Sequence, residues 1–421
     1  MSNERRISIQ ILQEILENKE FFAEIREKRK DRIHGAENFV SMLMLTTLRK
    51  KCFLEKTLRK FLQKPIKKKD IFVHYAIICA MCEIFYMDSP AYAILNDYVE
   101  IIKKENGRFA ASFANAVLRK ISLEKEKLLK NDTGMDFPAD FKNLLQNDYE
   151  KKTVDAVEKS FAEKPALDIT LKTPIPDFSE KTGALKLDNT SYRFYDYGDI
   201  KSIYGFEQGL WWVQDYAASL PVKLSENIKN KKVLDLCAAP GGKTAQLLSL
   251  GADVTAVDIS AKRLERLKEN MQRLHFDKVN IVCSDAISFL KNNPQDFDII
   301  LLDAPCSATG TFRRHPEIPH IKQREDIEKM QQLQKNILCE AAKAVKKGGE
   351  IIYCVCSIFK AEGECVIFDF LHEHNNFCIC PINNLSFIDE RIKTEENFIR
   401  TLPIYGNGMD SFFAVRLIRK S

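Results

Sequence analysis

The second half of the chain alternates short apolar runs with helical segments, and this alternation limits the fold more than any other feature. Apolar strands are predicted around Val233, Val254, Val279, Ile299 and Ile351, and segments such as 262–274 and 327–345 between them have helical spacing. Alternating strands and helices are typical of a doubly wound, mainly parallel α/β sheet. The last apolar run, 411–418, predicts one more strand, antiparallel and at the sheet edge.

The first half of the chain has a different pattern. Up to about residue 127 there is almost no Pro or Gly, and apolar residues recur with helical spacing. Ser89-Pro90 predicts a helix start and Asn106-Gly107 a helix stop. We therefore expect three parts: an all-helical domain over 1–130, a small α/β connecting module over 131–205, and the doubly wound domain over 206–421. Within the module, a short helix is expected over 140–159, followed by a run with the period-2 alternation of a strand over 167–172 and by the aromatic run 192–197.

Composition narrows the class of protein. A chain of 421 residues is longer than a domain with a single hydrophobic core usually is, so we expect two or three domains. No run of about 18 apolar residues occurs, and the N-terminus has no apolar leader, so we expect a cytoplasmic protein without a membrane partner. Oligomeric state is left open, with a monomer favoured.

The chain has 12 cysteines, without the regular spacing of a small secreted scaffold, which predicts reduced thiols. Most are interpreted as core residues, including Cys79, Cys82, Cys354 and Cys378. No metal site is expected, because Cys79 and Cys82 lack a second matching pair and the seven histidines are scattered.

Positive charge is concentrated in one segment. The net charge is only +5, yet residues 49–69 contain ten Lys or Arg and one acid, Glu55. Taken alone, such a run is usually a solvated helix face. The second half of the chain, however, contains motifs that suggest chemistry on a nucleobase. Together with them, the run favours a nucleic-acid partner, with Lys67, Lys68 and Lys69 as candidate phosphate contacts.

Two cysteines follow predicted strands. Cys306 ends the run Leu302-Asp-Ala-Pro-Cys306, and Cys356 ends Tyr353-Cys-Val-Cys356. A single cysteine at a strand end is usually a core residue. Because ligands of open α/β sheets bind beyond the carboxyl ends of the strands, the two thiols are expected to open into one crevice, close to the Gly-rich turn after Val233.

That turn, Cys237-Ala-Ala-Pro-Gly-Gly-Lys-Thr244, resembles a phosphate-binding loop only in part. Cys237 stands at the first required Gly, and Pro240 removes an N–H group that would bind phosphate. A nucleoside cofactor fits better, with Asp258 at the end of the next strand for ribose hydroxyls and Asp285 for an adenine amino group. Helix capping is an equal alternative for each aspartate.

Four motifs together resemble one family. They are the turn 235–244, Asp303-Ala-Pro-Cys-Ser-Ala-Thr-Gly310 with Arg313-Arg-His-Pro316, Tyr353-Cys-Val-Cys-Ser357, and Ser411-Phe-Phe-Ala414. The chain is similar to the S-adenosylmethionine-dependent RNA (cytosine-5)-methyltransferases, and within them to the bacterial small-subunit rRNA methyltransferase B group. Residues 109–119 resemble the NusB-type helical RNA-binding domain that this group carries at its N-terminus.

The resemblance implies a Rossmann-like class I methyltransferase sheet and a mechanism. A thiolate adds to cytosine C6 so that C5 can take the methyl group. Cys356 matches the nucleophile and Cys306 the cysteine that assists release. Asp303 matches the carboxyl group that holds the cytosine edge, and Lys243 could lower a thiol pKa or line the pocket. The target base must be unpaired or flipped out.

The resemblance also implies binding residues. S-adenosylmethionine would be held by the turn and the acids at strand ends, a set consisting of Cys237, Ala238, Ala239, Pro240, Gly241, Gly242, Lys243, Asp258, Arg263, Asp285 and Asp303. Small-subunit rRNA is the expected partner, with Arg313 and Arg314 as further phosphate contacts or, equally, as a solvated loop. Two departures are Val355, where the family usually has Thr, and 167–171, where many members carry Arg and Asn for RNA contact.

Three rival functions follow. The same reaction could act on another RNA, such as tRNA, or the chain could be a catalytically silent RNA-binding ribosome-assembly factor. A P-loop nucleotide hydrolase is the third, which Cys237 disfavours. Methyl incorporation and nucleotide turnover would distinguish them.

Overall fold

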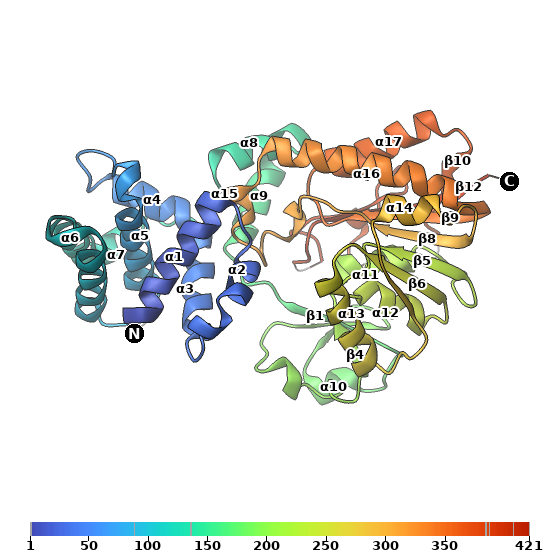
Figure 1. Cartoon of the computed structure of the whole chain (residues 1–421), viewed down its shortest axis with the longest axis horizontal. Coiled ribbons are helices and arrows are strands. Elements are labelled where there is room, and N and C mark those ends of the chain that lie inside the picture. Colours follow the sequence, from blue (N-terminus) through green and yellow to red (C-terminus); the bar gives the residue numbers. More distant parts are fainter. Residues whose placement is uncertain are drawn as a thin grey trace. The chain divides into compact units, whose positions relative to one another are not determined.

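The computed structural model describes residues 2–87, 89–134, 137–383, 385–386, 388–406 and 408–420 (Figure 1). The chain forms two compact units. The first consists of Met1–Lys164 and Phe312–Gln323, and the second of Pro165–Thr311 and Arg324–Ser421. The predicted domain boundaries at residues 130 and 205 stay predictions, because packing into a unit does not decide where an independently folding domain ends. The sequence around the boundary at residue 130, Asn131-Asp-Thr-Gly-Met-Asp-Phe-Pro138, predicts a turn, and residues 135 and 136 of it lie outside the described residues.

The first unit is helical, as predicted. Its helices are α1 (Ser2–Asn18), α2 (Phe22–Lys28), α3 (Glu37–Arg49), α4 (Lys51–Arg59), α5 (Ile71–Tyr86), α6 (Ala91–Leu123), α7 (Lys125–Leu129), α8 (Ala139–Asp148), α9 (Lys151–Phe161) and α15 (Ile318–Ile321), with short 3-10 turns η1 (Lys30–Arg32) and η2 (Lys68–Asp70). Helix α5 is apolar on nearly all sides and buried, and Cys79 and Cys82 within it are core residues, as expected.

One local prediction for this unit is confirmed and one needs correction. Helix α6 begins directly after Pro90, and within its bounds Gly107, with φ of 85°, is non-helical, so two helical segments meet there across a kink. The predicted helix stop at Asn106-Gly107 is therefore confirmed, because a positive φ suits Gly and interrupts the helical conformation. The single helix expected over 140–159 is wrong, since α8 and α9 are separated at Tyr149–Glu150, where both residues are extended.

The second unit begins with a small antiparallel sheet. It contains β1 (Leu167–Leu171), β2 (Leu185–Lys186), β3 (Ser191–Phe194) and β4 (Trp211–Val213) in the order β2-β3-β1-β4, with α10 (Phe178–Thr182) and η3 (Ile200–Ser202) between strands. Strand β1 is buried throughout rather than alternating. Asp168 pairs in register with Arg193, and their buried side chains form a two-pronged ion pair of 2.6 and 2.7 Å, which satisfies both charges inside the sheet.

The larger sheet has eight strands: β5 (Lys232–Leu236), β6 (Asp253–Asp258), β7 (Asn280–Cys283), β8 (Phe297–Asp303), β9 (Val345–Val355), β10 (Phe377–Ile379), β11 (Ile399–Thr401) and β12 (Phe412–Arg419). The order is β10-β12-β9-β8-β5-β6-β7, with β11 also paired to β12. The predicted strands from β5 to β9 are confirmed and are parallel. Strand β12 is antiparallel as predicted, but it is not an edge strand, because β9 and β10 flank it.

Helices cover both faces of this sheet (Figure 1). One face carries α11 (Tyr216–Lys223), α12 (Gly242–Ser249) and α13 (Ala261–Arg273), and the other α14 (Ala286–Lys291), α16 (Arg324–Ala344) and α17 (Glu364–Glu373); η4 (Thr309–Thr311), η5 (Lys360–Glu362) and η6 (Glu390–Ile392) are loop turns. Burial on both faces explains why the strands read as continuous apolar runs. Cys354 is core, as expected, but Cys378 is exposed, contrary to prediction.

In the described part of the chain, no helix combines the length and the apolarity that crossing a membrane requires.

Candidate active site

The two strand-end thiols meet. Strands β8 and β9 are neighbours and parallel, so the loops that follow them leave the same edge of the sheet. Cys306 lies just after β8 and Cys356 just after β9, and their Sγ atoms are 3.3 Å apart. A backbone hydrogen bond of 3.0 Å from Gly310 N to the Cys356 carbonyl ties the two loops together. The predicted convergence is confirmed.

The surroundings of Cys306 favour its neutral form. Its hydrogen bond with Cys356, followed by burial, raises the pKa of the Cys306 thiol well above its ordinary value. Cys306 therefore keeps its proton at neutral pH, directly beside the sulfur atom of Cys356. Gly310 allows the loop after β8 to pack against both the loop after β9 and the start of β12, because a Cβ atom there would lie 3.0 Å from the Cys356 carbonyl carbon and 1.9 Å from the Ser411 carbonyl oxygen.

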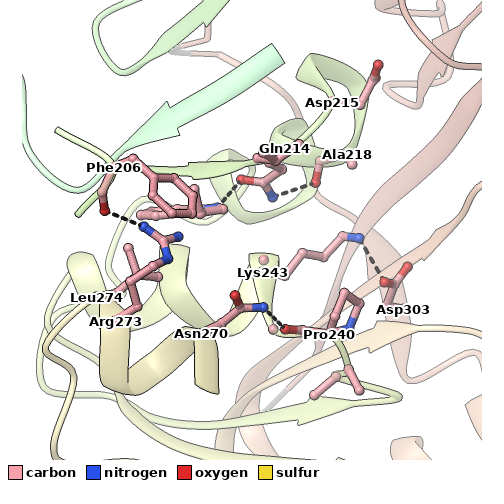
Figure 2. A pocket seen from close by; sticks show the side chains of 16 residues that line it. Phe206, Gln214, Asp215, Ala218, Pro240, Lys243, Asn270, Arg273, Leu274 and Asp303 are labelled. Carbon is pink, nitrogen blue, oxygen red and sulfur yellow. Dashed lines mark hydrogen bonds and ion pairs between the residues drawn. The ribbon is translucent and has the colours of Figure 1, made fainter. Parts of the chain in front are cut away.

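An ion pair lies at the end of β8. Lys243 Nζ, on α12, is 2.8 Å from Asp303 Oδ2 and 5.0 Å from the ring centre of Phe412 (Figure 2). Burial opposes the charged form of Lys243, but the nearby Asp303 carboxylate outweighs it and raises the lysine pKa. Lys243 is thus a cation at neutral pH. The other Asp303 oxygen is 3.5 Å from Cys354 Sγ.

The Gly-rich turn connects β5 to α12 with unusual backbone angles. Cys237, at the position where a phosphate-binding loop has Gly, is left-handed with φ of 61°. Gly241 has φ of 101°, and a Cβ atom there would lie 2.9 Å from Leu267. Below the turn, Thr244 Oγ1 donates to buried Asp235 at 2.6 Å, and burial raises the pKa of Asp235 to about 7. The turn is therefore fixed from below.

Asp258 braces the same turn. Its carboxylate accepts hydrogen bonds from Ala239 N at 3.2 Å and Ser260 N at 2.9 Å, and it lies 3.4 Å from Arg263 Nη1. The residue that caps α13 is Ser260, so the capping alternative for Asp258 is wrong. Asp285 does cap a helix, because it accepts from Ser288 N at the start of α14.

A cavity of about 470 Å³ opens beside the turn (Figure 2). Its lining includes residues 238–243 and Asp303 of the predicted cofactor set. The lining does not include the other members of that set, Cys237, Asp258, Arg263 and Asp285, nor the two thiols. Further lining residues, which the sequence did not single out as site residues, are Phe206, Trp212, Val213, Gln214, Asp215, Ala218, Asn270, Arg273 and Leu274.

This arrangement fits the cofactor that the sequence suggested. Gly241 lets α13 pack directly against the turn, because a Cβ atom there would lie 2.9 Å from Leu267, and three acids stand at or just after the ends of β6, β7 and β8: Asp258, Asp285 and Asp303. A carboxylate at the end of the second strand suits ribose hydroxyls. The ligand role of each residue stays a prediction.

The candidate RNA contacts lie in the first unit and differ in exposure. Lys67, Lys68 and Lys69 are exposed around η2. Arg313 is only 4% exposed, and its carbonyl accepts a hydrogen bond of 2.9 Å from Arg49. The solvated-loop interpretation is therefore wrong for Arg313, and its burial favours a structural role over phosphate contact. Arg314 is half-buried.

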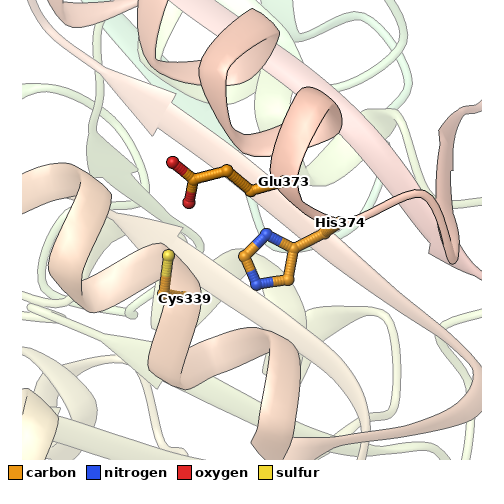
Figure 3. Close-up of side chains that lie close together, drawn as sticks. All are labelled: Cys339, Glu373 and His374. Carbon is orange, nitrogen blue, oxygen red and sulfur yellow. The ribbon is translucent and has the colours of Figure 1, made fainter.

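One group outside this site has metal-ligand chemistry. Atoms of Cys339, Glu373 and His374 lie within 4.8 Å of one another (Figure 3), a group the sequence did not reveal because α16 and the end of α17 supply it. His374 stacks on Phe370 at 4.3 Å, and Glu373 is exposed. Burial raises the pKa of Cys339, which disfavours the thiolate that a metal ion binds.

Comparison with known proteins gives a consistent result. The profile of the family described as 16S rRNA methyltransferase RsmB/F matches residues 223–418, and that of the NusB family matches residues 2–123. Ribosomal RNA small subunit methyltransferase B of Vibrio vulnificus is 33% identical over 332 residues, which cover 73% of this chain and 76% of that protein. The protein of the same name from Cronobacter sakazakii is 28% identical, with 99% of both chains covered.

Solved structures share the fold. The crystal structure of PH0851 matches with a TM-score of 0.77 and 21% identity, covering 99% of this chain and 98% of that one. NSun6 from Pyrococcus horikoshii, crystallised with SFG, matches with a TM-score of 0.60 and 17% identity over 68% of this chain and 99% of its own.

Proposed function

Because the chain belongs to the 16S rRNA methyltransferase RsmB/F family, an S-adenosylmethionine-dependent group of rRNA methyltransferases, we propose that it methylates C5 of a cytosine in small-subunit rRNA. The same proposal includes a cytoplasmic location, where ribosomal RNA is modified in bacteria. One observation supports C5 of cytosine as the methylated atom: the Sγ atoms of Cys306 and Cys356 lie 3.3 Å apart.

The reaction needs two thiol steps. Cytosine C5 is a poor nucleophile, so the Cys356 thiolate forms a bond to C6 and the ring electrons move to C5, which takes the methyl group. A base, such as a water molecule, then takes the C5 proton, the electrons of the C5–H bond restore the C5–C6 double bond, and the Cys356 sulfur leaves C6 with its bonding electrons. S-adenosylmethionine supplies an electrophilic methyl group when bound.

Cys306 is suited to the release step. Its neutral thiol lies within hydrogen-bonding distance of the sulfur that must leave as a thiolate. A proton donor beside a leaving group favours bond breaking. This geometry supports Cys356 as the nucleophile and Cys306 as the residue that assists release.

Lys243 and Asp303 are suited to hold the base. The Asp303 carboxylate lies at the β8 end, where it can accept a hydrogen bond from the cytosine amino group, and Lys243 fixes it at 2.8 Å. Their mutual ion pair keeps both side chains in one orientation before substrate arrives. The cofactor would be held by the turn 237–242, with Asp258 at the ribose.

The test is bisulfite-type mapping of total RNA from cells with and without the gene. We expect one 5-methylcytosine of small-subunit rRNA to disappear without the gene and to return on complementation. Loss of a tRNA cytosine signal instead would assign another RNA substrate. An unchanged methylation map with a ribosome-assembly defect would favour a silent assembly factor. Purified protein and unmodified rRNA should reproduce the modification.

A further inference from the structure

Glu362 is buried between the two thiol-bearing loops. It ends η5, and none of its surface is exposed. The sequence patterns gave no reason to select it, since it stands among Lys360, Ala361 and Gly363 in a loop that looks solvated. A fully buried carboxyl group must have its oxygens satisfied by hydrogen bonds, so its partners show what it organises.

The Glu362 carboxylate accepts four hydrogen bonds. Oε1 accepts from Ser307 N at 2.8 Å and from Gln334 Nε2 at 3.1 Å. Oε2 accepts from the hydroxyl groups of Ser307 and Ser357, each at 2.5 Å. Ser307 directly follows Cys306 and Ser357 directly follows Cys356. One carboxylate therefore holds the neighbours of both thiols.

Buried polar groups extend this network. Thr309 Oγ1 lies 2.9 Å from Ser307 Oγ and 3.0 Å from Ser357 Oγ, and Gln334 also donates to the Pro305 carbonyl at 2.9 Å. The Glu362 carbonyl accepts from the Tyr353 hydroxyl at 2.6 Å. Networks of this kind fix one arrangement when every donor is paired. The network therefore spans the loops after β8 and β9.

We propose that Glu362 is a positioning residue that sets the separation and orientation of the Cys306 and Cys356 thiols by binding both loops through Ser307 and Ser357. The importance of Glu362 for catalysis rests on the proposed function. Its effect on the separation of the two thiols does not depend on RNA. Small displacements of reacting groups can cost roughly a hundredfold in rate, so an anchor common to both loops matters.

A carboxylate suits this place better than an amide. Four donors converge on Glu362, and a carboxylate offers acceptors only. In Glu362→Gln, the amide NH₂ group must face some of these donors. The serine hydroxyls can turn to accept, but the Ser307 N–H cannot. Glu362→Gln should therefore be partly impaired, and Glu362→Ala severely.

The first experiment measures thiol separation without RNA. Diamide, an azo oxidant, takes two hydrogen atoms from two thiols and becomes a hydrazine as the disulfide forms. We expect the parental protein to form a Cys306–Cys356 link, identified by peptide mass spectrometry, and Glu362→Ala to form it about tenfold or more slowly. Glu362→Gln should fall between them. Equal rates in all three proteins would overturn the proposal.

Glu350→Gln is the matched control. Glu350 lies in the middle of β9, the strand that also carries Tyr353, and its carboxylate binds Arg416 and Ser225 and none of the residues around the thiols named above. Its variant should oxidise at the parental rate. If Glu362→Ala does not fold, as judged by its melting temperature, Glu362→Gln decides by the same comparison. Each folded Glu362 variant should bind S-adenosylmethionine with the same affinity as the parental protein, as measured by calorimetry.

The second experiment separates the two loops. Ser357→Ala should slow covalent adduct formation in a Cys306→Ala background, and Ser307→Ala should slow product release in the parental background. Glu362→Gln should do both, lowering kcat while leaving the KM for S-adenosylmethionine unchanged. A parental kcat for Glu362→Gln would contradict the catalytic meaning of the anchor. If the parental protein methylates no RNA, the proposed function fails, yet the oxidation rates still decide the positioning role.

Discussion

The Sγ atoms of Cys306 and Cys356 lie 3.3 Å apart although fifty positions separate them in the chain. Two adjacent parallel strands produce this contact, because each thiol occupies the loop immediately after its strand. Such proximity allows one thiol to donate a proton to the sulfur of the other, so the two steps of the proposed covalent methylation can use different residues at one place.

Replacing each cysteine should therefore block a different step. Cys356→Ala should abolish methyl transfer and leave cofactor binding intact, because the proposed nucleophile is removed but the turn is not touched. Cys306→Ala should still attack and then fail to release, so a covalent protein–RNA adduct should accumulate on denaturing gels. An adduct with Cys356→Ala but none with Cys306→Ala would reverse the assigned roles.

Asp258 should contribute to cofactor affinity. Asp258→Ala removes the acid at the end of β6, and we expect S-adenosylmethionine to bind more weakly by roughly 1–3 kcal/mol, the range for leaving buried polar groups unpaired. Ser260→Ala is the control, because it removes the cap of α13 without removing the carboxylate. It should cost about 1 kcal/mol of stability and no affinity. Equal affinities by calorimetry for Asp258→Ala and the parental protein would exclude the ribose role.

The exposed cations around η2 should contribute to RNA binding. Changing Lys67, Lys68 and Lys69 together to Gln should weaken binding and reduce the slope of log K against log salt by up to about 2, because fewer counterions are released. Lys151, Lys152 and Lys159, exposed on α9 of the same unit, provide a control with the same charge change. If the variant of Lys67, Lys68 and Lys69 binds RNA with the parental salt slope, these lysines do not contact phosphate and form only a solvated surface.

Asp235 should make stability depend on pH in an unusual direction. Burial raises its pKa to about 7, whereas in the unfolded chain it ionises near pH 4. Between these values the folded protein holds more protons, so the stability contributed by Asp235 is present at low pH and is lost as pH rises to 7. Asp235→Asn, which cannot ionise, should gain stability relative to the parental protein over this range.

The size of that gain is bounded by the pKa difference. Relative to the parental protein, the free energy of unfolding of Asp235→Asn should increase by up to roughly 4 kcal/mol between pH 4 and pH 7 and then level off. Unfolding curves at several pH values measure it. Parallel curves for the two proteins would mean that Asp235 does not titrate in this way.

Sequence reasoning succeeded where burial leaves a strong periodic pattern. Strands covered by helices on both faces are continuously apolar, which made β5 to β9 recognisable, and strand ends then located Cys306 and Cys356. The position of β12 inside the sheet could not be predicted, since an apolar run does not reveal how many neighbours a strand has. Val355, the departure from the family Thr, lies in an apolar cluster on one face of the sheet.

Polar groups with distant partners escaped prediction. Glu362 and Arg313 look like charged loop residues in the sequence, and only the folded chain shows that both are buried. Asn270 and Arg273 belong to the polar side of an amphipathic helix, a pattern that does not distinguish a solvated face from a cavity wall. Their roles depend on contacts between segments that periodicity does not link.

The short segment Phe312–Gln323 means that the protein cannot be divided by a single cut. Phe312 packs against Phe137 and Phe161 at 5.3 and 5.9 Å, and Glu317 accepts a hydrogen bond from Phe22 N. A fragment that began at Pro165 would still carry this segment but would lack those partners, leaving Phe312 and Ile321, which pack against residues of the N-terminal helices, exposed to water. Loss of the N-terminal helices by proteolysis should therefore yield an aggregation-prone remnant, and not a smaller working enzyme.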